Sequence, residues 1–296
     1  MSKKIQVDFY RVEMPEDSSL PLEEIIKQVI QLNDTARTED IRGVPIKLHE
    51  VSQWGECWEG NMIRIRMTQM PVKASLRGSV SPFNLRDDEG MGEQTAFLYH
   101  LRTRILLLQN SQLGVSISAL AKYFEKKGNL NSPIAFDPVI QKDAMLRLME
   151  MPMIRKLDIR TAGLDNAQLL EGQGYGVKEI AQLSQELRAP TMELSLSVGR
   201  GKNKSLSKER AVEIIHSLLR VSNQNARQVG KVRVTGLTED KELVLLDLLR
   251  DRMRENLNLG QNKKRNIDYT ERKEALRKAW DIRQDELFSM FLPPTF

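Results

Sequence analysis

The sequence has little of the chemistry on which metal and redox sites depend. Its 296 residues include one cysteine, Cys57, and three histidines, His49, His100 and His216, which lie far apart along the chain. A single cysteine forms no internal disulfide, and these spacings match no zinc-binding pattern. We therefore expect no metal site and no cofactor.

Long apolar runs are also missing. The longest, such as Leu243–Leu246, are far shorter than the roughly 18 residues that a membrane-spanning helix needs. The first residues become polar again at once and form no apolar stretch of signal-peptide length. These features predict a cytoplasmic protein.

What the chain does have is an ordinary globular composition, with 40% apolar and 29% charged residues. Alternating apolar residues predict strands, and apolar residues at helical spacing predict helices. Strands and helices follow one another without a regular βα repeat, which favours an α+β fold with two lobes, each a mostly antiparallel sheet with packed helices. We place the boundary in the glycine-punctuated stretch near residue 165, giving an N-terminal domain (1–165) and a basic C-terminal domain (166–296). The predicted strands are 5–12, 46–52, 56–70, 95–101, 104–109, 152–160, 191–198, 231–234 and 242–248, and the predicted helices are 20–33, 116–128, 178–187, 206–221 and 269–291.

The positive charge is concentrated in one part of the chain. The whole sequence carries +5, but residues 199–296 carry +7 and residues 1–198 carry −2. Residues 199–233 alone hold nine cations and two acids. They form a predicted loop, helix and strand joined by short connections, so we expect them to form one basic patch that binds nucleic-acid phosphates.

The candidate nucleic-acid-binding residues comprise the nine cations of that element and three from a later basic run. They are Arg200, Lys202, Lys204, Lys208, Arg210, Arg220, Arg227, Lys231, Arg233, Lys263, Lys264 and Arg265. Aromatic residues make up 5% of the chain and none is interleaved with the basic run, so base stacking is not indicated. Contact with the phosphate backbone, without sequence readout, is the better interpretation.

Known nucleotide-binding and catalytic motifs are not matched. Residues 199–205 contain Gly-x-Gly-Lys but not the spacing of a phosphate-binding loop. Cys57, between Trp54 and Trp58, has no adjacent activating group, which favours a buried packing residue over a nucleophile. We find no defensible catalytic constellation and do not expect an enzyme.

The order of several features resembles the family of the phage exclusion protein RexA and related bacterial phage-defence proteins. The resemblance rests on the acidic turn 87–92, followed by two apolar strands and a helix ending at Lys127–Gly128. It also rests on the strand 191–198, the basic run 200–208 and helix 206–221, and on the C-terminal helix around Tyr269–Leu287. These segments cover about half of the chain.

The resemblance implies a homodimer that binds DNA with little sequence preference and senses a phage-derived complex. It also implies a separate membrane protein as the effector. Arg200, Lys202, Lys204 and Lys208 stand in the cationic stretch of that family. The glycines at 199 and 201 depart from it.

Two other functions are compatible with the same residues. One is a protein-interaction module whose basic face binds an acidic partner, with helix 269–291 as a docking surface for this chain or a second copy. The other is a metal-dependent nuclease, suggested by Asp158, Glu193 and Asp247 on or beside predicted strands. The residues do not distinguish DNA from RNA, or single from double strands.

Overall fold

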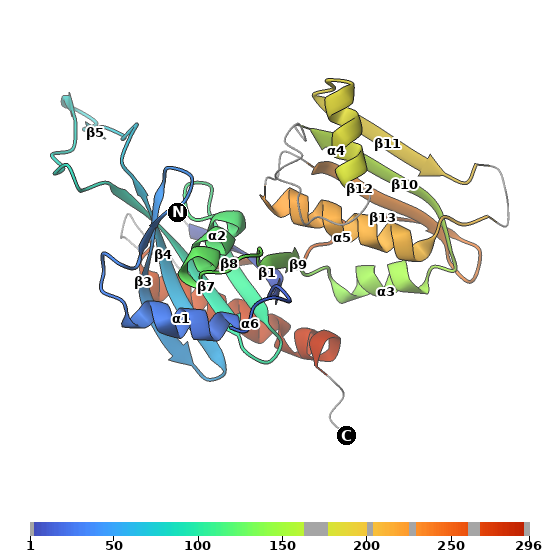
Figure 1. Ribbon diagram of the computed structural model, residues 1–296, viewed down its shortest axis with the longest axis horizontal. Helices are drawn as coiled ribbons and strands as arrows, with labels where there is room; N and C mark the ends of the chain where they lie inside the picture. Colours follow the sequence, from blue (N-terminus) through green and yellow to red (C-terminus); the bar gives the residue numbers. More distant parts are fainter. Residues whose placement is uncertain (1–2, 163–176, 200–203, 225–228, 260–266, 293–296) are drawn as a thin grey trace. The chain divides into compact units, whose positions relative to one another are not determined.

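The computed structural model describes residues 3–162, 177–199, 204–224, 229–259 and 267–292 (Figure 1). The chain divides into two compact units that are interleaved along the sequence. Unit 1 comprises residues 1–7, 14–134 and 255–284, and unit 2 comprises residues 8–13, 135–254 and 285–296. Both are built from helices and mostly antiparallel sheets, which confirms the predicted α+β fold with a long C-terminal helix.

Unit 1 is organised around a large sheet whose strand order is β14-β1-β8-β7-β4-β3-β2. Two short strands, β5 and β6, form a separate hairpin in the connection between β4 and β7. The elements are β1 (Lys3–Glu13), α1 (Leu22–Gln31), β2 (Thr38–Asp40), β3 (Pro45–Trp54), β4 (Cys57–Arg66), β5 (Lys73–Ala74), β6 (Val80–Ser81), β7 (Met91–His100), β8 (Ile105–Asn110), α2 (Ile117–Lys127), β14 (Arg254–Leu259) and α6 (Tyr269–Phe291).

Alternation along the strands sends side chains to two buried faces of this sheet. On one face, Phe97 of β7 packs edge-to-face against Phe124 of α2, with ring centroids 6.0 Å apart. Gly60 lies opposite Phe97 on β4, where a Cβ would approach the Phe97 ring to 2.2 Å, so this contact requires glycine. On the other face, the rings of His100 and Trp280 of α6 stack with centroids 4.4 Å apart. The sheet of unit 1 is therefore covered on both faces.

Unit 2 contains a four-stranded antiparallel sheet with the order β11-β10-β12-β13. A short strand, β9, pairs with residues 10–13 of β1. The elements are β9 (Ala135–Pro138), α3 (Lys142–Glu150), β10 (Met153–Ala162), α4 (Val177–Glu186), β11 (Thr191–Ser197), α5 (Lys208–Gln224), β12 (Val229–Leu237) and β13 (Leu243–Asp247).

The helices of unit 2 share one hydrophobic core with one face of this sheet. Leu157 of β10 and Val232 of β12 pack in a cluster with Leu148 of α3, Ala181 of α4 and Leu218 of α5. Figure 1 shows α5 running along the strands. The apolar stripe of α5 is thus buried against this face of the sheet, and the opposite face carries the polar side chains.

The division into units differs from the expected boundary near residue 165. That position falls in the range 163–176, which lies outside the described residues, and the chain on both sides of it belongs to unit 2. The C-terminal helix does not belong to the basic lobe alone, because residues up to Gln284 pack in unit 1. Long-range strand pairing produces this interleaving, and no local periodicity encodes it.

Three further features bear on the sequence-based expectations. Leu276 and Trp280, on the apolar seam of α6, are 1% and 4% exposed, so this part of the seam docks on its own chain. Cys57 is buried, and burial raises the pKa of its thiol to about 12, in agreement with a packing role. No helix in the described ranges combines the length and apolarity needed to cross a bilayer.

Candidate nucleic-acid interface

The face of the unit 2 sheet that α3, α4 and α5 leave uncovered gathers charged side chains from all four strands. Residues at odd positions of β12 and even positions of β10 point away from the helices, because neighbouring side chains alternate between the two faces of a strand. We call this surface the open face. It is defined by Lys156, Asp158 and Arg160 of β10, Glu193 and Ser195 of β11, Lys231, Arg233 and Thr235 of β12, and Leu243, Leu245 and Asp247 of β13.

The strand register sets cations beside carboxylates on the open face. Asp158 lies opposite Arg233, which lies opposite Asp247 on the next strand. Arg160 lies opposite both Glu193 and Lys231. Directly opposed residues in an antiparallel pair bring their side chains close together. Arg233 forms a cross-strand ion pair with Asp247 in this way, and Arg160 forms one with Glu193.

The distances show that each carboxylate of the open face binds at least one cation. Asp247 is 2.9 Å from Nε of Arg233 and 3.7 Å from Nε of Arg250, which follows β13. Lys156 Nζ lies 2.8 Å from Asp158. Glu193 is 3.5 Å from Arg160 and 3.8 Å from Lys231. With Arg250 included, five cations surround three carboxylates, so the surface keeps a positive excess.

The titration of Asp158 reflects that excess. Burial acts to raise the pKa of its carboxyl group, but hydrogen bonds from Lys156 and Ser195 and the charges of Lys156 and Lys231 outweigh it. The pKa of Asp158 therefore lies below its usual value. The local potential on the open face favours negative charge.

The structure separates the predicted basic residues onto different sides of the sheet. Lys231 and Arg233 lie on the open face, whereas Lys208, Arg210 and Arg220 belong to α5, which covers the other face. These two groups therefore do not form one continuous flat patch.

The three cations of α5 have partners of their own. Lys208 Nζ donates to the carbonyl oxygens of Met149 and Met151 at the end of α3. Arg220 binds both oxygens of Asp137, whose hydrogen bonds raise the pKa of the guanidinium. Arg210 is exposed and lies 2.8 Å from Glu213 one turn along the helix. Lys208 and Arg220 thus hold unit 2 together, and Arg210 is accessible.

The loop after β11 begins next to the sheet. Gly199 has φ +63°, a conformation that glycine adopts without strain, so the glycine at this position has a structural reason. Arg155 of β10 donates to the carbonyl oxygens of Gly199 and Lys204, at 3.1 and 2.9 Å, and so ties both ends of the loop to the sheet. Lys204 is exposed. The other predicted residues, Arg200, Lys202, Arg227, Lys263, Lys264 and Arg265, lie outside the described residues.

Sequence reasoning missed Lys156 and Arg160 as members of this surface. They alternate with Leu157 and Ile159, so the pattern of β10 contained the signal. What it lacked was the neighbouring strand, because only the pairing of β10 with β12 places these cations beside Lys231 and Arg233.

Asp158, Glu193 and Asp247 do share the open face, as a metal-dependent nuclease would require of them. Arg233 lies between Asp158 and Asp247, however, and Arg160 lies beside Glu193. Within the ranges that the structure describes, no three His, Cys, Asp or Glu residues gather as metal ligands would. The arrangement suits the binding of an external anion better than that of a cation.

A comparison with protein families gives a match over most of the chain. Residues 1–286 match the sequence profile of DUF6731, a family of unknown function. A comparison with curated proteins finds no match.

Proposed function

This chain belongs to DUF6731, a family of unknown function, and we propose from its own residues that it binds nucleic acid through phosphate contacts on the open face of unit 2. The observation that carries the proposal is that four cations of the open face, with Arg250 beside them, accompany three carboxylates on the side of the sheet that α3, α4 and α5 leave uncovered. Polyanionic backbones recruit such surfaces because cation–phosphate contacts release condensed counterions.

The composition of the open face favours backbone contact over base recognition. Its defining residues include no aromatic side chain on which a base could stack. The existing ion pairs hold Arg160, Lys231 and Arg233 in place, and a phosphate group can replace the carboxylate partner. Lys204, at the end of the loop after β11, is a further exposed cation of the same unit. We infer binding that depends strongly on salt and weakly on sequence.

The resemblance to RexA-type phage exclusion proteins supplies the biological setting of the proposal. In that setting the ligand is DNA, the protein is a cytoplasmic homodimer, and a separate membrane protein is the effector of phage defence. These elements rest on the resemblance, and the open face is the part that rests on geometry.

The decisive experiment measures fluorescence anisotropy of labelled duplex and single-stranded oligonucleotides of unrelated sequence over a salt series. We expect K231Q/R233Q to weaken binding about tenfold or more and to reduce the slope of log K against log salt by about two. The matched control is K178Q/R210Q, which removes two exposed cations from helices of the same unit. An equal loss in both variants, or no binding at low salt, would contradict the assignment.

The same assay distinguishes simple nucleic-acid binding from the nuclease alternative. With magnesium present, the proposal predicts an intact probe. A shortened probe whose production is lost in D158N or D247N would favour the nuclease.

A second candidate function has an observation of its own. β13 pairs with β12 alone in the described sheet, and its Leu243 and Leu245 are 70% and 58% exposed. Arg250, which follows this strand, binds Asp247 at its end. An exposed edge strand of this kind can pair with an extended segment of an acidic protein. Poly-L-glutamate tests this reading, because it competes with DNA efficiently only if acidic polypeptide is the preferred ligand. L243S/L245S should weaken that competition and leave the affinity for DNA unchanged.

A further inference from the structure

Unit 1 contains a cavity of about 280 Å³ that the open face does not involve. It lies between the turn that joins β2 to β3 and the beginning of α2, and its wall also includes part of β4. Ile46, Val115 and Ala119 contribute apolar surface. The volume is near the lower end of the roughly 300–1,000 Å³ typical of ligand pockets, which limits an occupant to a small molecule.

Two arginines line this cavity and no carboxylate does. Arg42 comes from the β2–β3 turn and Arg64 from β4. Arg64 donates one bond, to the carbonyl oxygen of Leu113 at 3.0 Å, and a guanidinium has five N–H donors. Glu93 is opposite Arg64 in the sheet, but it forms a 3.0 Å ion pair with Arg66. The pocket therefore has positive charge with donor capacity to spare.

The first turn of α2 adds to the same potential. Ser116 caps the helix by accepting from the N–H of Ala119, and Ser116 and Ser118 both line the cavity. The positive end of the helix dipole is thus directed toward the pocket, where the hydroxyl groups of Ser116 and Ser118 hydrogen-bond to each other at 3.1 Å. Charge and hydrogen-bond donors come from three separate segments of the chain.

The backbone of Arg42 is left-handed, as it also is at Arg104 and Arg188. It has φ 57° in a tight turn closed by mutual hydrogen bonds between Ile41 and Val44, followed by Gly43 at φ 79°. Such positions favour Gly, Asn or Asp, and a long side chain there costs free energy. This turn places Arg42, which is exposed, on the wall of the cavity.

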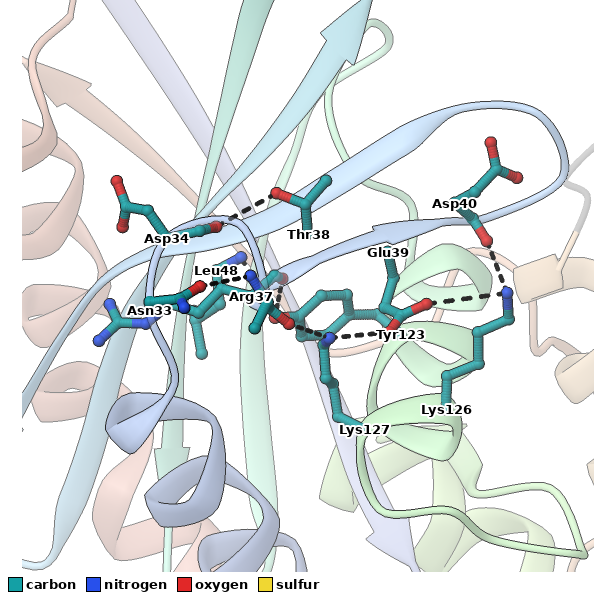
Figure 2. Close-up of polar contacts among 11 residues, drawn as sticks. Asn33, Asp34, Arg37, Thr38, Glu39, Asp40, Leu48, Tyr123, Lys126 and Lys127 are labelled. Carbon is teal, nitrogen blue, oxygen red and sulfur yellow. Dashed lines mark hydrogen bonds and ion pairs between the residues drawn. The ribbon is translucent and has the colours of Figure 1, made fainter.

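Figure 2 shows that side chains of α2 hold the segment that leads into this turn. Lys126 Nζ donates to the carbonyl oxygen of Asp40 at 2.7 Å. The hydroxyl of Tyr123 donates to the carbonyl oxygen of Arg37, also at 2.7 Å. Lys127 binds Glu39 at 2.7 Å and also the carbonyl oxygen of Ala36. The wall that carries Arg42 is therefore preorganised, which lowers the entropic cost of binding.

We propose that this cavity binds a small organic phosphate, a phosphate monoester on a compact apolar body. Two guanidinium groups and several neutral donors match a dianionic phosphate better than a singly charged carboxylate. The apolar wall matches the remainder of the molecule. The site is independent of the nucleic-acid function proposed for unit 2.

Isothermal titration calorimetry with phenyl phosphate tests the site, with phenol and inorganic phosphate as fragments that each lack one half of the ligand. We expect phenyl phosphate to bind at least tenfold more tightly than either fragment. Equal binding of phenyl phosphate and inorganic phosphate would overturn the proposal, because it would leave the apolar wall without a role.

The variant R42G separates ligand binding from folding. Glycine is favoured at φ 57°, so R42G should retain or raise the thermal unfolding temperature and weaken phenyl phosphate binding about tenfold. A119F fills the cavity while keeping both arginines, and it should abolish binding in a protein with an unchanged circular dichroism spectrum. R77Q removes an exposed arginine of the same unit outside the cavity and should bind normally.

K231Q/R233Q in unit 2 should also bind phenyl phosphate normally. Wild-type affinity in R42G and A119F would overturn the proposal. Loss of binding in K231Q/R233Q would likewise overturn it, because the ligand would then occupy the open face.

Discussion

Arg277 of α6 binds both carboxylate oxygens of Glu59, a β4 residue that is 1% exposed. The guanidinium also lies over the ring of Trp54, 4.9 Å from its centroid, and Glu59 raises the pKa of Arg277. A buried carboxylate without its partner is strongly destabilising, whereas removing both charges is tolerated much better. This pair therefore fixes the position of α6 on the sheet of unit 1.

We predict that R277M lowers the free energy of unfolding of unit 1 by about 3 kcal/mol, because it leaves the charge of Glu59 uncompensated. The double variant E59Q/R277M should recover more than about 1 kcal/mol of that loss. All three tryptophans, Trp54, Trp58 and Trp280, belong to unit 1, so their fluorescence in a urea titration reports this unit specifically. If the losses of unfolding free energy in E59Q and in R277M add up to the loss in E59Q/R277M, the two residues are not coupled.

His100 predicts a dependence of unit 1 stability on pH. Burial lowers the pKa of its imidazole, and the neighbouring Glu56 raises it by a smaller amount, so the folded-state pKa lies below the usual value of about 6.5. The unfolded chain then binds more protons than the folded chain in this window, and stability decreases as the pH falls from about 6.5 toward the folded-state pKa.

Urea titrations of the wild type between pH 8 and 5 should show this loss. H100Q should show a smaller loss over the same range, and H49Q, which removes an exposed histidine of the same unit, should behave like the wild type. A steeper loss in H100Q would contradict the inferred direction of the pKa shift.

The hydroxyl of Tyr123 anchors the β2 segment to α2. It donates to the carbonyl oxygen of Arg37 and accepts from the N–H of Leu48 at 3.4 Å. Y123F removes both bonds and leaves a carbonyl oxygen without that partner, so we expect a loss of about 1–2 kcal/mol. K126M changes a side chain that is 52% exposed and should cost less than about 0.5 kcal/mol in the same denaturation experiment. Similar losses of unfolding free energy in Y123F and K126M would mean that the hydrogen bonds of the buried hydroxyl stabilise the fold no more than the exposed ammonium group does.

Local patterns predicted the individual elements well. The alternation of Leu157 and Ile159 indicated β10, and the spacing of Ala211, Ile215 and Leu218 indicated α5, because each buries one face. Short or weakly patterned elements were missed, among them α3 and β14.

Strand pairing was the information that local patterns lacked. β14 joins the sheet of unit 1 beside β1, and α6 returns to the same sheet through Arg277, across more than 200 residues of sequence. For the candidate site, the sequence identified the cations of residues 204–233 but not which side of the sheet each would occupy. A helix and a strand that are neighbours in sequence, such as α5 and β12, present their charges to opposite sides when the helix covers the strand.

The carboxylate of Asp247 gives the sharpest test of the open face. It binds Arg233 and Arg250, so in D247N both guanidiniums lose a competing anion and the surface gains one positive charge. We expect D247N to increase the affinity for DNA several-fold at moderate salt and to steepen the salt dependence. E213Q removes an equal charge beside Arg210 on α5 and should change the affinity little, because α5 covers the other face. Weaker binding by D247N in the anisotropy assay would mean that Asp247 positions the ligand or a metal ion, which would favour the nuclease over simple phosphate binding.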